Sequence, residues 1–145
     1  MNQVNLSYDP GVVPNKPSPS PGDTFTIEVE GLPPYKDTSR SIRNINHPRY
    51  DAFITLRRAA IGAMDGRAYY TGAVALDLTV YAPDLHKNRN IADYAAGIED
   101  TIDGSSGVTF TYLPIIIQDD CQVANWTMRY IKAAEARYCL VVTFL

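Results

Sequence analysis

Apolar residues that alternate with polar ones predict four strands in this chain. In Thr24–Glu30 the apolar side chains of Phe25, Ile27 and Val29 alternate with threonine and glutamate, which is typical of a strand with one buried face. Later stretches favour strands in the same way, although the last one is more continuously apolar. The predicted strands are 24–30, 73–81, 122–131 and 138–145.

Apolar residues that recur every three or four positions predict two helices. From Arg49 to Met64 they form one stripe, and Arg57 and Arg58 lie next to this stripe, not at its centre. A second stripe runs from Ile91 to Ile102. Asp-Gly sequences follow both stripes and are expected to end the helices.

The order of elements predicts an α+β fold, β-α-β-α-β-β. We expect a single mixed sheet with both helices packed on one face, because the apolar stripes need a sheet to bury them. The last two strands are joined by a connection of hairpin length. The apolar segment 109–117, TFTYLPIII, has no place in this order. It is expected to be an added strand or part of an interface with a partner.

The length and the distribution of proline indicate one domain preceded by a tail. Residues 1–22 contain five prolines and many small polar residues, and are predicted to be a disordered tail. The remaining residues, 23–145, are sufficient for one domain with its own core.

The chain has no sequence feature that directs it to a membrane. No apolar run approaches the roughly 20 residues that span a bilayer, and the N-terminus lacks the pattern of a secretory signal. Its two cysteines are too few for a disulfide framework. We therefore expect a cytoplasmic protein.

Charge is unevenly distributed along the chain, although the net charge is only −3. Residues 36–89 carry nine basic and five acidic side chains, whereas 90–120 carry six acidic ones and no basic one. This distribution suits a polyanion-binding surface beside a cation site. Ordinary surface charge is the alternative, and the acidic pI of about 5.2 argues against strong nucleic-acid binding.

Four stretches resemble the RusA-type family of Holliday-junction resolvases. They are EVEGLPPYKD at 28–37, VYAPDLHKNR at 80–89, NIADYAAGIEDTIDG at 90–104 and QDDCQV at 118–123. The resemblance implies a RusA-like domain over 23–145 that acts as a homodimer on branched DNA in recombination and repair. It also implies a Mg²⁺-dependent endodeoxyribonuclease with no small-molecule cofactor.

The chain departs from the family at the start of the second helix. Asn90 and Ala92 occupy the places of two aspartates, Asp93 that of an asparagine, and Ala96 that of a lysine. The later matches include Asp100, Gly104 and the pair Asp119 and Asp120. Since two carboxylates and a cation are missing, catalysis is expected to be impaired or lost. The alternative is a non-catalytic dimer of the same fold that binds DNA or another protein.

The resemblance also implies the candidate site residues. Asp119, Asp120 and Asn90 are the predicted catalytic residues, and these three with Asp93 are the predicted Mg²⁺ ligands. Without the family, the aspartate pair is an ordinary surface turn. The predicted contacts to nucleic acid are Lys87, Arg89, Arg40 and Arg43, for which a solvated loop is the alternative. The two histidines, His47 and His86, are expected at the surface.

Overall fold

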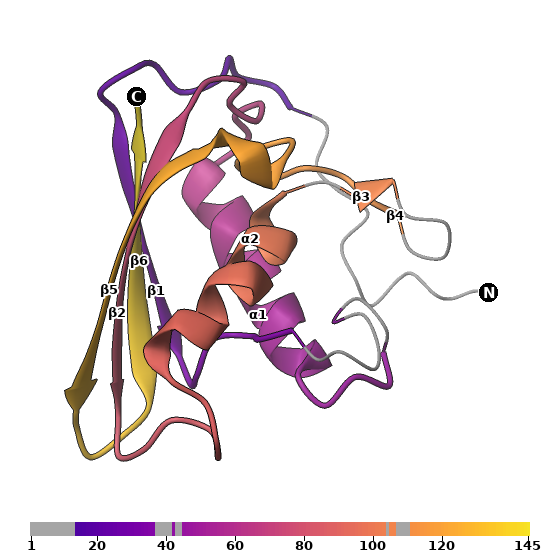
Figure 1. Ribbon diagram of the computed structural model, residues 1–145. Coiled ribbons are helices and arrows are strands. Elements are labelled where there is room, and N and C mark those ends of the chain that lie inside the picture. Colours follow the sequence, from indigo (N-terminus) through magenta and orange to yellow (C-terminus); the bar gives the residue numbers. More distant parts are fainter. Residues whose placement is uncertain (1–13, 37–41, 43–44, 104, 107–110) are drawn as a thin grey trace.

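The computed structural model describes residues 14–36, 42, 45–103, 105–106 and 111–145, without the side chains of 105–106 and 111–112. Four strands form one sheet, and two helices lie on one side of it (Figure 1). The predicted α+β class and the single mixed sheet are therefore confirmed. Among the described residues, no helix combines the length and apolarity needed to cross a bilayer.

The sheet has the strand order β1-β6-β2-β5. Its outer pair β1 and β6 is antiparallel, β6 and β2 are antiparallel, and β2 and β5 are parallel. All four strands lie within a residue of their predicted bounds. These bounds are β1 Thr24–Glu30, β2 Val74–Ala82, β5 Val123–Lys132 and β6 Arg137–Phe144.

The last two strands do not pair with each other, despite their short connection. Strand β2 lies between them and pairs with both. The connection crosses the end of β2, where the Ala133 N–H donates to the Ala82 carbonyl at 3.0 Å. At its far end, the Ala136 carbonyl accepts from the Gly31 N–H at 2.9 Å.

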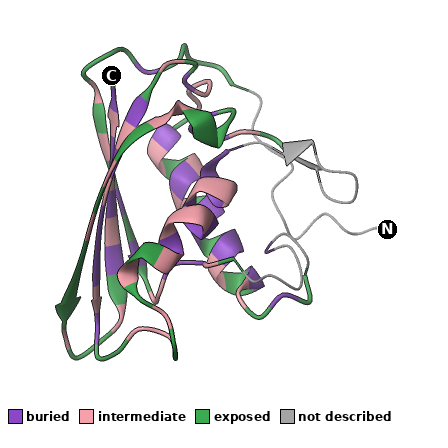
Figure 2. Ribbon diagram, in the orientation of Figure 1, coloured by how far each residue is buried: buried purple, intermediate pink, exposed green. Residues whose placement is uncertain are grey.

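The helices cover one face of the sheet and form the core with it. The helical elements are α1 Tyr50–Met64, the 3-10 turn η2 Ile91–Tyr94, α2 Ala95–Ile102 and the 3-10 turn η3 Asp120–Gln122. Two short strands, β3 Ser105–Ser106 and β4 Thr111–Tyr112, pair with each other away from the main sheet. Buried residues line the space between helices and sheet (Figure 2).

Helix α1 ends where the Asp-Gly pair predicts. Asp65 adopts the left-handed conformation with φ of 49°, and its N–H donates to the Ile61 carbonyl at 3.1 Å. Gly66 continues the turn with φ of 83°, which glycine adopts without the strain that a Cβ would cause. The chain can therefore reverse toward β2 directly after the helix.

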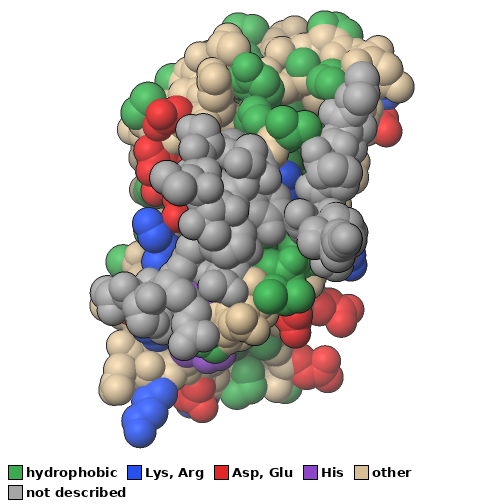
Figure 3. Space-filling model, turned by 90° about the vertical axis from the view of Figure 1, so that its right-hand side faces the viewer, with side chains coloured by type: hydrophobic (Ala, Val, Ile, Leu, Met, Phe, Trp, Pro, Cys, Tyr) green, Lys and Arg blue, Asp and Glu red, His purple; other side chains and the backbone are tan. Residues whose placement is uncertain are grey.

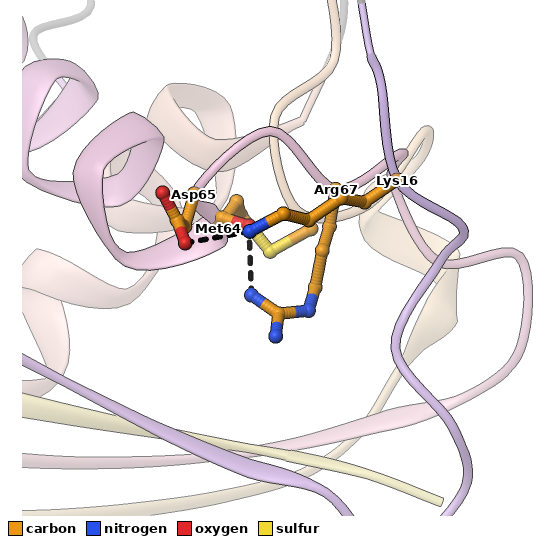
Figure 4. A network of polar contacts seen from close by, with 4 residues as sticks. All are labelled: Lys16, Met64, Asp65 and Arg67. Carbon is orange, nitrogen blue, oxygen red and sulfur yellow. Dashed lines mark hydrogen bonds and ion pairs between the residues drawn. The ribbon is translucent and has the colours of Figure 1, made fainter.

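Part of the predicted tail lies along this turn. The Asn15 and Lys16 N–H groups donate to the Gly66 carbonyl at 2.9 and 3.1 Å. The Lys16 ammonium lies 2.8 Å from the Asp65 carboxylate, and the Arg67 guanidinium donates to the Met64 carbonyl (Figure 4). The segment 14–22 is thus held against the domain, whereas 1–13 lie outside the described residues.

The described part of the TFTYLPIII segment belongs to the core. Ile115, Ile116 and Ile117 are buried, and their N–H groups all approach the Ile102 carbonyl at 3.1–3.4 Å. These side chains are therefore not available to a partner, and the expectation that they form an interface is wrong for this part of the segment.

Two polar residues, His47 and Arg57, are more buried in the structure than the sequence predicts. His47 is only 3% exposed, and its Nδ1 accepts from the Arg49 N–H at 2.9 Å, so the expected surface position is wrong. Arg57 is fully buried in α1, although it lies beside the apolar stripe in sequence. Its guanidinium donates to the Thr101 and Leu113 carbonyls at 3.2 and 3.0 Å.

Candidate metal centre

The two aspartates before β5, Asp119 and Asp120, have different roles. Asp119 is the N-cap of η3, and its carboxylate accepts from the Cys121 N–H at 2.9 Å. The Gln122 side-chain oxygen accepts from the Asp119 N–H at 3.1 Å, which completes a capping box. Hydrogen bonds from Cys121 lower the pKa of Asp119. This carboxylate therefore stabilises the turn that presents Asp120.

Gln122 anchors that turn to the chain before β2. Its side-chain amide donates to the Tyr70 and Gly72 carbonyls, at 2.8 Å each. The Tyr70 N–H donates in turn to the Ile116 carbonyl at 2.8 Å. Because Gln122 holds both its own turn and a distant segment, the position of Asp120 is determined by tertiary contacts.

Asp120 meets two carboxylates from the end of α2. One oxygen from each of Asp100, Asp103 and Asp120 lies within 4.8 Å of the other two. We call these three residues the acidic cluster. Ligands on opposite sides of Mg²⁺ are roughly 4.2 Å apart, and those of Ca²⁺ roughly 5 Å apart. The spacing accommodates a divalent cation directly or through a bridging water.

Mutual repulsion and burial raise the pKa of two acids at this site. Burial raises the pKa of Asp120, and the carboxylates of Asp119 and Asp100 raise it further. Burial also raises the pKa of Glu99, with contributions from Asp120 and Asp100, although a hydrogen bond from Trp126 opposes the effect. A bound cation would relieve this repulsion.

One basic side chain already approaches the acidic cluster. The Lys36 ammonium lies 3.1 Å from the Asp100 carboxylate and opposes the rise in the pKa of Asp120 and of Glu99. Lys36 is exposed, so its ammonium can leave at little cost. Acidic and basic side chains lie next to each other at the left of the face drawn in Figure 3.

The structure places the other predicted ligands at the far end of the second helix. Asn90 and Asp93 form the capping box of η2: the Asn90 side chain accepts from the Ala92 N–H, and the Asp93 carboxylate accepts from the Asn90 N–H. Figure 1 shows the chain before α2 and the turn before β5 at opposite ends of α2. Asp120 is therefore brought to Asp100 and Asp103, and these capping contacts occupy Asn90 and Asp93.

Sequence reasoning did not select Asp100 or Asp103 as ligands, although Asp100 was a family match. A signal was present, because Asp100 lies in the last turn of α2 and Asp103 directly follows its last residue. It was weak, because acids with this spacing are common on solvated helix ends.

The predicted basic contacts lie in different surroundings. Lys87 is exposed, whereas Arg89 is half-buried and its guanidinium carbon lies 4.1 Å from the centroid of the Tyr35 ring. Arg40 and Arg43 lie outside the described residues.

Neither protein-family models nor curated proteins match this chain. No protein-family model matches it, and no curated protein shows significant similarity.

Proposed function

We propose that this chain is a RusA-like domain that binds a divalent cation and acts on branched DNA as a metal-dependent endonuclease, with catalysis weaker than that of the family. The convergence of Asp100, Asp103 and Asp120 carries the proposal. The three aspartates supply the hard, charged oxygen ligands that Mg²⁺ prefers. The Asp120 carboxylate is repelled by the neighbouring carboxylates, and a bound cation would remove this repulsion.

The proposed chemistry needs the acidic cluster to hold a cation that contacts a phosphodiester. A divalent cation there would polarise the phosphoryl oxygen and lower the pKa of a bound water. Asp120 is the predicted catalytic residue that this geometry supports directly. Asp119 would act through the turn that positions Asp120. The roles predicted for Asn90 and Asp93 as ligands remain predictions.

A second candidate is a non-catalytic dimer of the same fold. The Lys36 ammonium beside Asp100 favours it, because it neutralises part of the acidic cluster without any metal. Ala92 and Ala96 favour it too, since neither can supply the carboxylate or the cation found there in the family. In this case the chain would bind DNA or a protein partner without cutting.

Metal binding and junction cleavage together test the proposal. Isothermal titration with Mn²⁺ and Mg²⁺ should show binding by the unaltered chain, and Asp120→Asn and Asp100→Asn should each weaken it. Removing one charged oxygen ligand costs roughly tenfold or more in affinity. Glu135→Gln is the matched control, because Glu135 is exposed in the turn between β5 and β6.

Incubation with a four-way DNA junction and Mn²⁺ then separates the two candidates. Cleavage that is lost in Asp120→Asn supports the endonuclease. Junction binding without cleavage supports the non-catalytic dimer. If the unaltered chain binds no divalent cation at millimolar concentration, the proposed centre is wrong.

A further inference from the structure

Three basic side chains surround the ring of Tyr35, at the end of α2 away from the acidic cluster. The guanidinium carbons of Arg89 and Arg49 lie 4.1 and 5.7 Å from the ring centroid. The ring of His86 meets that of Tyr35 edge-on, with 5.2 Å between centroids. We call Tyr35, Arg49, His86 and Arg89 the basic cluster.

No described carboxylate forms an ion pair with the two arginines of this cluster. Among the described residues, no carboxylate lies within 4.0 Å of the Arg49 or the Arg89 guanidinium, whereas Arg129 has an acidic partner at 2.8 Å. The positive charges of Arg49 and Arg89 add to the effect of burial in lowering the pKa of His86. Two guanidinium groups therefore share one ring, and neither forms an ion pair with a described carboxylate.

The cluster also contains polar atoms without hydrogen-bond partners. Arg49 Nε and His86 Nε2 are buried, and neither makes a hydrogen bond with any described residue. One terminal nitrogen of Arg49 donates to the Leu32 and Pro33 carbonyls at 2.9 and 3.2 Å, which fixes the guanidinium. A buried polar atom without a partner is costly. An anion within reach would accept from Arg49 Nε, and from His86 Nε2 when that nitrogen carries the proton.

We propose that Arg49, His86 and Arg89 form an oxyanion site that receives a phosphate group of a nucleic-acid strand. Arginine presents a planar fork of donors that matches phosphate oxygens, and Tyr35 holds the Arg89 fork by a cation–π contact. The phosphate site rests on this geometry alone. Its assignment to nucleic acid rests on the proposed function.

A neighbouring pocket helps to locate the site. Arg49 also lines a pocket of about 220 Å³ that contains Glu30 and Asp51 but not Tyr35 or Arg89. Carboxylates in that pocket disfavour an anion there. The phosphate is therefore expected on the side of Tyr35.

Helix α2 connects the basic cluster to the acidic cluster. A Cβ on Gly97 would come within 2.3 Å of the Pro34 carbonyl oxygen, so α2 lies against the backbone next to Tyr35. The Tyr35 ring meets the Tyr94 ring with 6.1 Å between centroids, and from Tyr94 to Asp100 the helix rises about 9 Å. At 3.4 Å per nucleotide, this corresponds to roughly three phosphates of one strand. A strand held at the basic cluster can therefore also reach the acidic cluster.

Binding of phosphate and of a short single strand tests the site without any metal. Inorganic phosphate is added in a thermal-melting experiment, and a labelled oligothymidylate of twelve nucleotides is titrated by fluorescence anisotropy in EDTA at low salt. Arg89→Gln should remove the phosphate-induced rise in melting temperature and weaken strand binding about ten- to a hundredfold. It should also reduce the salt dependence by about one phosphate contact.

Two further variants make the result specific. His86→Phe should also weaken binding, because it removes the ring N–H donor and keeps an aromatic ring beside Tyr35. Arg129→Gln is the matched control: its guanidinium is paired with Asp77 on the face of the sheet away from the helices, and binding should not change.

The outcomes separate this proposal from the proposed function. Unchanged strand and phosphate binding in Arg89→Gln overturns the site, as does the absence of both kinds of binding in the unaltered chain. A phosphate effect without strand binding supports the oxyanion site and overturns its assignment to nucleic acid. Because every measurement is made in EDTA, failure of the acidic cluster to bind metal does not affect the result.

Discussion

At the scale of single residues, Arg57 shows how a buried charge holds the domain together. Its guanidinium donates to the Thr101 carbonyl at the end of α2 and to the Leu113 carbonyl, residues far from it in sequence. It lies 5.9 Å from the centroid of the Phe53 ring. Thr101 lies between Asp100 and Asp103, so Arg57 supports the backbone that carries two members of the acidic cluster.

Loss of the Arg57 guanidinium should destabilise the fold. Arg57→Met keeps most of the side-chain volume but leaves two carbonyls without their donor, and we expect a loss of about 2–4 kcal/mol in the free energy of unfolding. Urea denaturation measures this. Arg58→Met, at the exposed neighbouring position, should change stability by about 0.5 kcal/mol or less. Equal effects of the two substitutions would contradict the role given to Arg57.

The Asp120 carboxylate is expected to stabilise the folded chain less than the amide of an asparagine at the same position would. Its folded pKa is raised above the ordinary 3.8, so its favourable contribution exists at low pH and is lost as the pH rises through the folded value. Asp120→Asn should therefore be slightly more stable at neutral pH in EDTA, by less than about 1 kcal/mol because the carboxylate is exposed. Thermal melting with EDTA and with Mn²⁺ measures this, and the unaltered chain should gain more stability from the metal than Asp120→Asn does.

His86 should titrate below its ordinary pKa of 6.5. Burial is the main cause, and Arg49 and Arg89 add to it; Tyr35 and Tyr94 are its other neighbours, the latter accepting from the His86 N–H at 3.3 Å. As the pH falls, His86 therefore takes up a proton in the unfolded chain before it does so in the folded chain. The free energy of unfolding should then decrease as the pH falls below 6.5 and level off below the pKa of His86 in the folded chain. His86→Gln should remove part of that decrease.

An NMR titration of the imidazole signals measures the His86 pKa directly. A value of 6.5 or above in phosphate-free buffer would contradict the effect of the two guanidinium groups. Addition of inorganic phosphate should raise the value, because a bound anion stabilises the protonated ring.

At the scale of elements, the contact between α2 and the Pro33–Pro34 segment requires a glycine. A Cβ at Gly97 would lie 2.3 Å from the Pro34 carbonyl oxygen and 2.7 Å from the Tyr35 Cα, and both are backbone atoms. Gly97→Ala should therefore destabilise the chain by about 1–3 kcal/mol despite the better helix propensity of alanine. It should also weaken phosphate binding, because the Tyr35 backbone must move.

Gly62 provides the matched control in α1. A Cβ there would meet nothing within 4 Å, so Gly62→Ala should stabilise the chain by about 0.5–1 kcal/mol. Opposite signs for the two substitutions in urea denaturation would confirm the close approach at Gly97. A stabilising Gly97→Ala would show that α2 and the Pro33–Pro34 segment are further apart.

The predicted helices and strands correspond closely to those in the structure. The way in which the strands pair, however, cannot be derived from the positions of these elements in the sequence. Period-two and period-3.6 patterns depend on which face of an element is buried, so they locate strands and helices from local sequence alone. The insertion of β2 between β5 and β6 has no local pattern, because their four-residue connection would equally suit a hairpin. The Ala133 to Ala82 hydrogen bond is instead a contact between residues 51 positions apart.

At the scale of the whole molecule, both helices lie on one face of the sheet, and no described element covers the other face (Figure 1). Edge strand β5 carries the exposed apolar side chains of Tyr130 and Ile131. The homodimer that the family resemblance implies remains a prediction. Sedimentation equilibrium should give twice the chain mass of 16.1 kDa at micromolar concentration. A mass of one chain across that range would contradict the dimer and leave both clusters within a single protomer.

The two clusters are the feature of the whole molecule on which both proposals depend. Uneven charge along the chain indicated a polyanion-binding surface beside a cation site, and the structure places a basic and an acidic cluster at opposite ends of α2. Only Asp120 and Arg89 of the predicted site residues belong to these clusters. Of the other members, His86 is close to Arg89 in sequence, whereas Asp100, Asp103, Tyr35 and Arg49 come from segments distant from Asp120 and Arg89.

The sequence by itself determined the class of fold, the bounds of the main strands and helices, and the ends of the helices, because burial periodicity and capping depend on residues within a few positions of each other. Only the tertiary structure decided which carboxylates meet and which arginines have no acidic partner among the described residues. Asp120 reaches Asp100 and Asp103 because β5 starts beside the end of α2, and Arg49 reaches Tyr35 and Arg89 because α1 and α2 lie on the same face of the sheet. Such proximity depends on packing between elements, for which one sequence carries no local signal.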